Sequence, residues 1–221
     1  MATSQPINVA TPATPVPRTE GRAVPLIRAL VRHLELPLLV IGGALVILSI
    51  LYPYWHITLH APQYPRGLGV DVYVYKMEPP KNVREVDGLN HYIGMIKLTD
   101  AATIERKISR IGIPILAALA VVSFWLRGAW RWLARVPLMI YPVVFVADLF
   151  AWLYYAGHSL DPRAPLSSSI HEFTPRLIGK GTIGQFSTQA HFDLGFWMAV
   201  AAAVVVLVAT IIGRRASNAA R

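Results

Sequence analysis

Two phrases, Pro53-Tyr-Trp-His-Ile-Thr-Leu-His-Ala-Pro-Gln-Tyr-Pro-Arg-Gly-Leu68 and Leu89-Asn-His-Tyr-Ile-Gly-Met95, bracket the stretch of sequence that decides the fold. Residues 52–95 hold three of the seven histidines and two of the five methionines. This stretch is polar and rich in aromatic residues, yet it follows an apolar run, 36–51. We therefore expect the rest of the chain to hold this stretch against the outer face of a membrane.

The composition lies outside the usual range of soluble proteins, because 54% of the 221 residues are hydrophobic and only 15% are charged. The apolar residues form four blocks, 36–51, 111–126, 136–156 and 194–213. A bilayer core takes roughly 20 helical residues, so the last two blocks are long enough to span it. Residues 52–55 extend the first block, and a stripe that begins at Ile104 extends the second. We predict an all-α membrane protein with four transmembrane helices and a larger extracytoplasmic region between the first two.

The formal net charge of +9 fits a membrane orientation better than a nucleic-acid surface. Arginines gather in three regions that share one side of a four-helix arrangement: Arg18, Arg22, Arg28 and Arg32; Arg127, Arg131 and Arg135; Arg214, Arg215 and Arg221. Positive charge favours the cytoplasmic side, which predicts that both termini are cytoplasmic. Arg106, Lys107 and Arg110 fall on the opposite side, in a long loop where this rule is weak.

The expected organisation follows from these blocks. The predicted regions are a disordered cytoplasmic arm (1–24), an interfacial amphipathic segment (25–35), the first span (36–55), an outer loop domain (56–110), the second span (111–126), a cytoplasmic loop (127–135), the third span (136–156), a second outer loop (157–192), the fourth span (193–213) and a cytoplasmic tail (214–221). Alternating residues at 70–75 predict a strand, so the outer loop domain should contain small α/β elements.

Histidines concentrate on the outer side of this topology. His56 lies just past the first span, His158 just past the third, and His191 just before the fourth. All three should therefore lie near one membrane interface, where side chains of facing helices can build a metal site.

Two further pairs, His91 with Met95 and His56 with His60, are four residues apart and would share a helical face. Imidazole with thioether and without thiolate suits copper better than zinc or an iron–sulfur cluster, because the soft sulfur of methionine favours Cu(I). We predict His91 and Met95 as the leading copper ligands, followed by His56 and His158, with His60 and His191 after them. The alternative is that these histidines are amphipathic anchors at the membrane interface.

Asp148 lies in the middle of the third apolar block. A carboxylate there is costly and should face the bundle interior. Two interpretations stay open: part of a proton or ion path, or a structural hydrogen bond to Tyr141, Tyr154 or the backbone.

Several familiar chemistries are excluded by the sequence. The chain has no cysteine, hence no disulfide, thiolate ligand or covalent haem attachment, and it has no phosphate-binding glycine loop and no nucleophile elbow. We therefore expect a protein that is not an enzyme.

The phrases Trp55-His-Ile-Thr-Leu-His-Ala-Pro-Gln-Tyr-Pro65 and Leu89-Asn-His-Tyr-Ile-Gly-Met95, and more loosely Phe173-Thr-Pro and Ile183-Gly-Gln-Phe-Ser-Thr188, resemble a family of bacterial multi-pass membrane proteins. Members tend to be encoded near nitrous-oxide reductase and its copper-delivery accessory proteins. The resemblance implies an inner-membrane protein in a context of copper handling, respiration and denitrification.

The expected function is an accessory protein that binds or passes copper on the extracytoplasmic side and supports a periplasmic copper enzyme such as nitrous-oxide reductase. One alternative is a structural subunit of a respiratory complex that uses its outer loops as a docking surface. A second alternative is a haem b or quinone site between the spans. The expected partners are the lipid bilayer and a copper enzyme or respiratory subunits, not nucleic acid.

Overall fold

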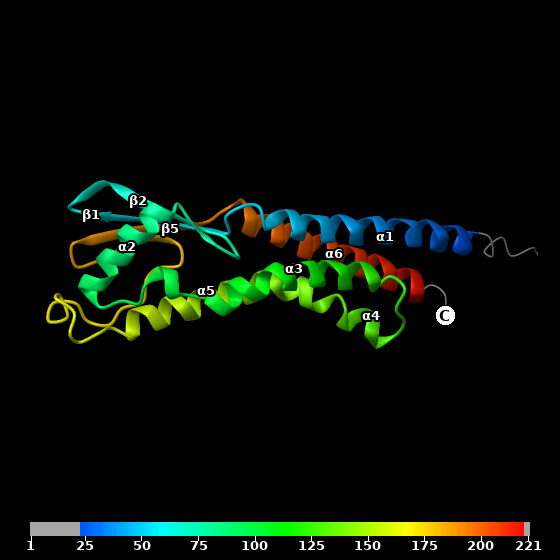
Figure 1. Cartoon of the computed structure of the whole chain (residues 1–221). Helices are drawn as coiled ribbons and strands as arrows, with labels where there is room; N and C mark the ends of the chain where they lie inside the picture. Colours follow the sequence, from blue (N-terminus) through cyan, green and yellow to red (C-terminus); the bar gives the residue numbers. More distant parts are fainter. Residues whose placement is uncertain (1–22, 219–221) are drawn as a thin grey trace, which may run out of the picture.

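The computed structural model describes residues 23–218 and is an elongated molecule, with helices along its length and a β-sheet at one end (Figure 1). The predicted disordered arm, 1–24, lies outside the described residues except for its last two. The predicted tail, 214–221, is described up to residue 218.

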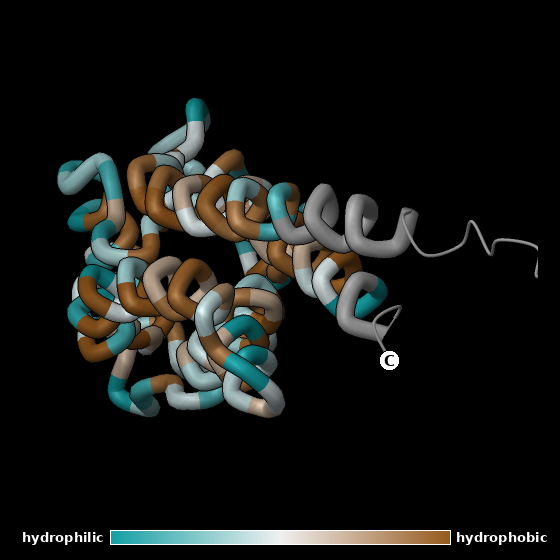
Figure 2. Tube along the Cα trace, turned by 90° about the vertical axis from the view of Figure 1, so that its right-hand side faces the viewer, coloured by the Kyte–Doolittle hydropathy of each residue, from teal (hydrophilic) through white to brown (hydrophobic). Residues whose placement is uncertain are grey.

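Four long helices run along the molecule: α1 (Ala23–Ser49), α3 (Thr103–Val122), α5 (Val136–His158) and α6 (Leu194–Asn218). The short helix α4 (Ala129–Leu133) lies between α3 and α5 at the end away from the sheet (Figure 1). Seen from that end, the helices carry long apolar stretches (Figure 2). Helix α1 packs along α6 and α3, and the core of the bundle includes the buried residues Ile113, Leu138 and Val206.

The prediction of four transmembrane helices is wrong. Within residues 23–218, two segments are long and apolar enough to cross a membrane: Ala129–His158, which contains α4 and α5, and Leu194–Arg215 in α6. Within the described residues, the apolar stretch of α1, His33–Ser49, is shorter than these two segments, and α1 ends at Ser49 before the chain enters a strand. Helix α3 begins at Thr103 and therefore includes the charged residues Glu105, Arg106, Lys107 and Arg110.

The prediction of an all-α protein is also wrong, because the chain forms a five-stranded antiparallel sheet in the order β3-β2-β1-β5-β4. The strands are β1 (Trp55–Ala61), β2 (Tyr64–Val72), β3 (Met77–Glu78), β4 (Gly179–Ile183) and β5 (Phe186–Phe192). Two of these strands, β4 and β5, come from the region predicted to be a second outer loop. Helix α2 (Pro80–Ile93) and a short 3-10 helix, η2 (Leu98–Asp100), follow β3.

The sheet has one apolar and one polar face, as the alternation of side chains along a strand requires. Ile57 and Leu59 of β1 pack with residues of α2, among them Val86 and Leu89. The intervening residues of β1 point to the other face, which carries polar side chains. Helix α2 therefore covers the apolar face.

The sheet is joined to the helices at two places, where α1 leads into β1 and where β5 leads into α6. Strands β1 and β5 pair with each other in the sheet, and helices α1 and α6 pack against each other in the bundle. At the junction, the backbone N–H of Gly195 donates to Pro53 over 2.8 Å. A Cβ at Gly195 would lie 2.5 Å from the carbonyl oxygen of Tyr52, so only glycine allows this approach. The junction fixes the sheet at one end of the bundle.

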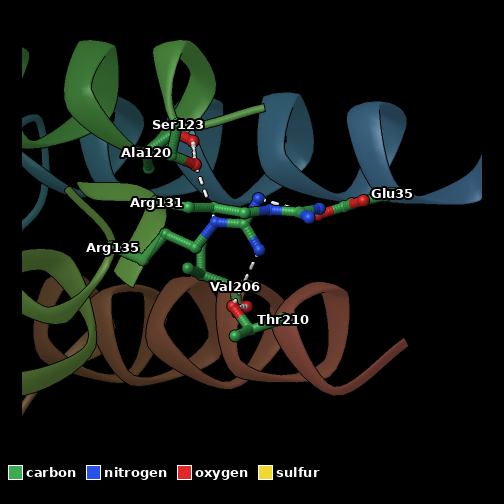
Figure 3. Close-up of polar contacts among 7 residues, drawn as sticks. All are labelled: Glu35, Ala120, Ser123, Arg131, Arg135, Val206 and Thr210. Carbon is green, nitrogen blue, oxygen red and sulfur yellow. Dashed lines mark hydrogen bonds and ion pairs between the residues drawn. The ribbon is translucent and has the colours of Figure 1, made fainter. Parts of the chain in front are cut away.

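A buried polar network joins the helices at the opposite end (Figure 3). The carboxylate of Glu35 in α1 accepts hydrogen bonds from Arg131 and, over 2.7 Å, from Arg135. Arg135 also donates to Ser123 of α3 over 2.7 Å and to Thr210 of α6 over 3.3 Å. Arg135 is only 1% exposed, so its charge depends on these partners.

Candidate functional site: a histidine pair on the sheet and a cavity beside it

The polar face of the sheet brings together two of the predicted ligands, His56 and His191. His56 of β1 is directly opposite His191 of β5, and their ring centroids lie 5.1 Å apart. On its other side His56 is opposite Asp71 of β2, whose Oδ1 lies 2.6 Å from Nδ1 of His56. We call these three residues the histidine pair site.

Asp71 determines which nitrogen of His56 is available. An ionised carboxylate only accepts hydrogen bonds, so Nδ1 of His56 carries the hydrogen that it donates to Asp71. In the neutral ring Nε2 then holds the lone pair, and the hydroxyl of Thr58 lies 2.9 Å from it. Metal-binding histidines typically have this arrangement, in which one nitrogen donates to a carboxylate and the other meets the metal.

His60 lies on the same face but does not belong to the histidine pair site. Residues 56 and 60 are in a strand, not a helix, so their four-residue separation corresponds to roughly 13 Å instead of one helical turn. His60 lies opposite Ser187, and its ring lies beside Gly67 in β2. His56 and His60 therefore cannot bind one ion together.

His91 and Met95 are separated by the end of a helix. Helix α2 ends at Ile93, and Gly94 follows in the left-handed conformation with φ 81°. His91 is exposed beside the ring of Tyr92, whereas Met95 packs against the apolar core under the sheet. The structure does not bring this predicted pair together.

His158 makes only local contacts among the described residues. It is the last residue of α5, its ring stacks on Tyr154 at 3.9 Å, and its Nδ1 lies 2.8 Å from the carbonyl oxygen of Tyr154. Across residues 23–218, no group of three or more His, Asp and Glu side chains is arranged to hold a metal. The predicted six-residue site is thus reduced to the histidine pair site.

The second phrase of the sequence has clear structural roles. Asn90 donates its side-chain amide to the carbonyl of Ile96 over 3.2 Å, and Asp87, two residues before the phrase, accepts the backbone N–H of Leu98 over 2.6 Å. The carbonyl of Gly94 accepts the N–H of Asp161 over 2.9 Å. This phrase therefore ends α2 and holds two following segments in place, residues 96–98 and the loop that contains Asp161.

The first phrase is attached to α2 by a tyrosine. The hydroxyl of Tyr64 donates to Glu85 over 2.5 Å. This hydrogen bond, more than burial, raises the pKa of Tyr64 above its usual value, because the carboxylate stabilises the protonated phenol.

Sequence reasoning did not find a cavity that lies between the sheet, α3 and α5. Its volume is about 520 Å³. Apolar side chains from the sheet, the loop after α2 and the two helices line it, among them Trp55, Met95, Ile113, Phe145 and Trp152. Glu105, Ser109 and Asp148 are among its few polar residues. Asp148 was the one signal in the sequence for this region, since it is a carboxylate in an apolar segment.

Asp148 lines this cavity and, within the described residues, does not form the structural hydrogen bond that was one of its two predicted roles. The cavity is also lined by Tyr141, but no hydrogen bond joins the two side chains, and none joins Asp148 to any other side chain in the described part of the chain. Burial raises the pKa of Tyr73, which lines the cavity on the sheet side, and Glu78 raises it further.

Comparison of the chain with protein-family models, curated proteins and solved structures gave no match, so the candidate sites rest on their geometry.

Proposed function

We propose that this chain is a membrane accessory protein that binds copper as cargo on the polar face of its sheet and passes it to a periplasmic copper enzyme. The observation that carries the proposal is the histidine pair site. Two imidazoles lie side by side on neighbouring strands, and a carboxylate orients one of them. Imidazole nitrogen suits copper, and divalent copper binds such ligands more tightly than zinc does.

The partial ligand set suits transfer. Two histidines leave further coordination positions to be filled, and His191 is exposed on the sheet. A partner protein can approach this face and supply the remaining ligands. The resemblance to proteins encoded near nitrous-oxide reductase supports an enzyme of that kind as the recipient.

The distribution of charge and apolar surface supports a multi-pass protein of the bacterial inner membrane. Exposed apolar side chains occur along α5 and α6, such as Val143 at 70% exposure and Val204 at 51%. Arg127 comes shortly before α4 and Arg214 lies in the last part of α6, and α4 and the end of α6 lie opposite the sheet (Figure 1). The positive-inside rule then favours cytoplasmic termini and a periplasmic sheet.

Copper analysis of the purified, detergent-solubilised protein tests this function. We expect about one copper per chain in the wild type, and loss of that copper in the double variant His56→Ala/His191→Ala. The double variant His91→Ala/Met95→Ala is the matched control and should retain copper. Zinc added at equal concentration should not displace the copper.

Other outcomes reject the proposal. Loss of copper from the control variant alone would return the site to His91 and Met95. If neither form retains or takes up copper while respiratory subunits co-purify with the protein, the alternative of a structural subunit with a docking surface replaces copper handling.

A further inference from the structure

We propose that the cavity between the sheet, α3 and α5 binds a membrane-soluble molecule that has an apolar body and a hydroxyl head group. This inference does not depend on copper, because the cavity adjoins the apolar face of the sheet and the histidine pair site lies on the polar face.

The size of the cavity fits a small organic ligand. Its volume of about 520 Å³ lies within the range of roughly 300–1,000 Å³ that is typical of ligand sites. It is also open to the surface of the molecule, so a ligand can enter it from outside.

The lining indicates an apolar body for the ligand. Trp55, Val72, Val74 and Met77 contribute from the sheet end, and the residues from α3 and α5 are mostly apolar as well. Helix α5 belongs to a segment long and apolar enough to cross a membrane. A ligand dissolved in the bilayer therefore meets the helix that forms one wall of the cavity.

The polar groups of the cavity indicate the head group. Oε2 of Glu105 is buried and has no hydrogen-bond partner among the described residues. Asp148, on the facing helix, also lines the cavity and forms no hydrogen bond there. A buried acceptor without a partner, such as this oxygen of Glu105, is costly, so a ligand that donates hydrogen bonds would be favoured.

Two cations, Lys97 and Arg106, also line the cavity, and neither forms an ion pair with these carboxylates. The guanidinium of Arg106 donates to the backbone carbonyls of Thr99 and Ala101 over 2.6 Å each, and to that of Ala102 over 3.3 Å. The unpaired acceptors favour a head group that donates hydrogen bonds, such as a hydroxyl.

Gly112 provides a way to fill the cavity without disturbing the fold. It lines the cavity, and a Cβ at this position meets only Cγ2 of Ile108, at 3.7 Å. Leucine is a better helix former than glycine, so Gly112→Leu should fill space and keep α3 intact. Gly88 in α2 is the matched control, because it is exposed, does not line the cavity and has no atom within 4 Å of its Cβ.

The experiment uses 4-decylphenol as the hydroxyl-bearing probe and 4-decylanisole as its methyl ether, which lacks the donor. Binding to the full chain in lipid nanodiscs is followed by the fluorescence of tryptophan, since Trp55 and Trp152 line the cavity. We expect saturable binding of the phenol to the wild type and to Gly88→Leu, at least 10-fold weaker binding of the anisole, and no saturable binding to Gly112→Leu. Glu105→Leu should bind phenol and anisole equally.

Mass spectrometry of the organic extract of the purified protein then identifies the natural source. A molecule enriched in the wild type relative to Gly112→Leu is expected to be either a quinol or a hydroxyl-bearing lipid, and its mass distinguishes the two. Equal extracts from both proteins, or phenol binding that Gly112→Leu leaves unchanged, would overturn the inference. Stronger binding of the anisole than of the phenol would overturn the assignment of the head group.

Discussion

Asp71 is the residue on which the chemistry of the histidine pair site depends most. It fixes the ring of His56 through a 2.6 Å contact and leaves Nε2 of that ring as the acceptor. Neither residue is deeply buried, with 25% of the His56 side chain and 36% of the Asp71 side chain exposed. The effect of Asp71 should therefore be on orientation and basicity of the ligand, with little effect on folding.

We predict that Asp71→Asn lowers the affinity for copper about 10- to 100-fold without changing the thermal unfolding temperature. The measurement is a competition titration with a chromophoric copper chelator. Asp100→Asn, at an exposed aspartate in η2, is the control and should keep the affinity of the wild type. Equal affinities in Asp71→Asn and the wild type would show that Asp71 does not orient the ligand.

The secondary structure of a segment could be predicted only where the segment's own residues determine it. The apolar blocks 136–156 and 194–213 lie in α5 and α6, because length and composition alone identify such helices. Strands β4 and β5 were missed, since β4 is short and contains two glycines, and both strands gain their structure by pairing, β5 with β1 and β4 with β5. The histidine pair site depends on the pairing of β1 with β5. His56 and His191 are 135 positions apart in the sequence, so the register that places them opposite each other could not be predicted from the sequence.

Helices α1, α3 and α6 are held to the start of α5 by the buried Glu35–Arg135 network. Glu35 is 3% exposed, and its loss would leave the charge of Arg135 without its carboxylate. We predict that Glu35→Ala destabilises the protein by about 3–5 kcal/mol. The measurement is thermal or denaturant unfolding in detergent, followed by circular dichroism.

The double variant Glu35→Leu/Arg135→Met distinguishes the effect of an unpaired charge on stability from the effect of lost packing. Replacement of both charges by apolar side chains of similar size should restore most of the stability, since the deeply buried charge of Arg135 is removed, and Arg131, the other partner of Glu35, has 27% of its side chain exposed. A double variant as unstable as Glu35→Ala would contradict this explanation and would indicate that Ser123 and Thr210 need the guanidinium.

At the scale of the whole molecule, the fold separates two ends. The sheet with the histidine pair site lies at one end, and α4, the first residues of α1 and the last residues of α6 lie at the other (Figure 1). The absence of cysteine from the chain allows single cysteines to report the orientation of these ends.

We predict that Gln189→Cys, on the exposed face of β5, reacts with a membrane-impermeant maleimide in intact spheroplasts. Arg127→Cys, in the exposed turn before α4, should react only after the membrane is permeabilised. The reverse pattern would place the sheet in the cytoplasm and would remove the periplasmic recipient of copper.

The most direct test of the central claim is X-ray absorption spectroscopy of the copper-loaded protein at the copper edge. If His56 and His191 bind one ion together, the spectrum of the wild type should contain two imidazole nitrogens in the first shell, and that of His191→Ala should contain one. A first shell with a sulfur scatterer from methionine, or one without imidazole nitrogen, would contradict the account.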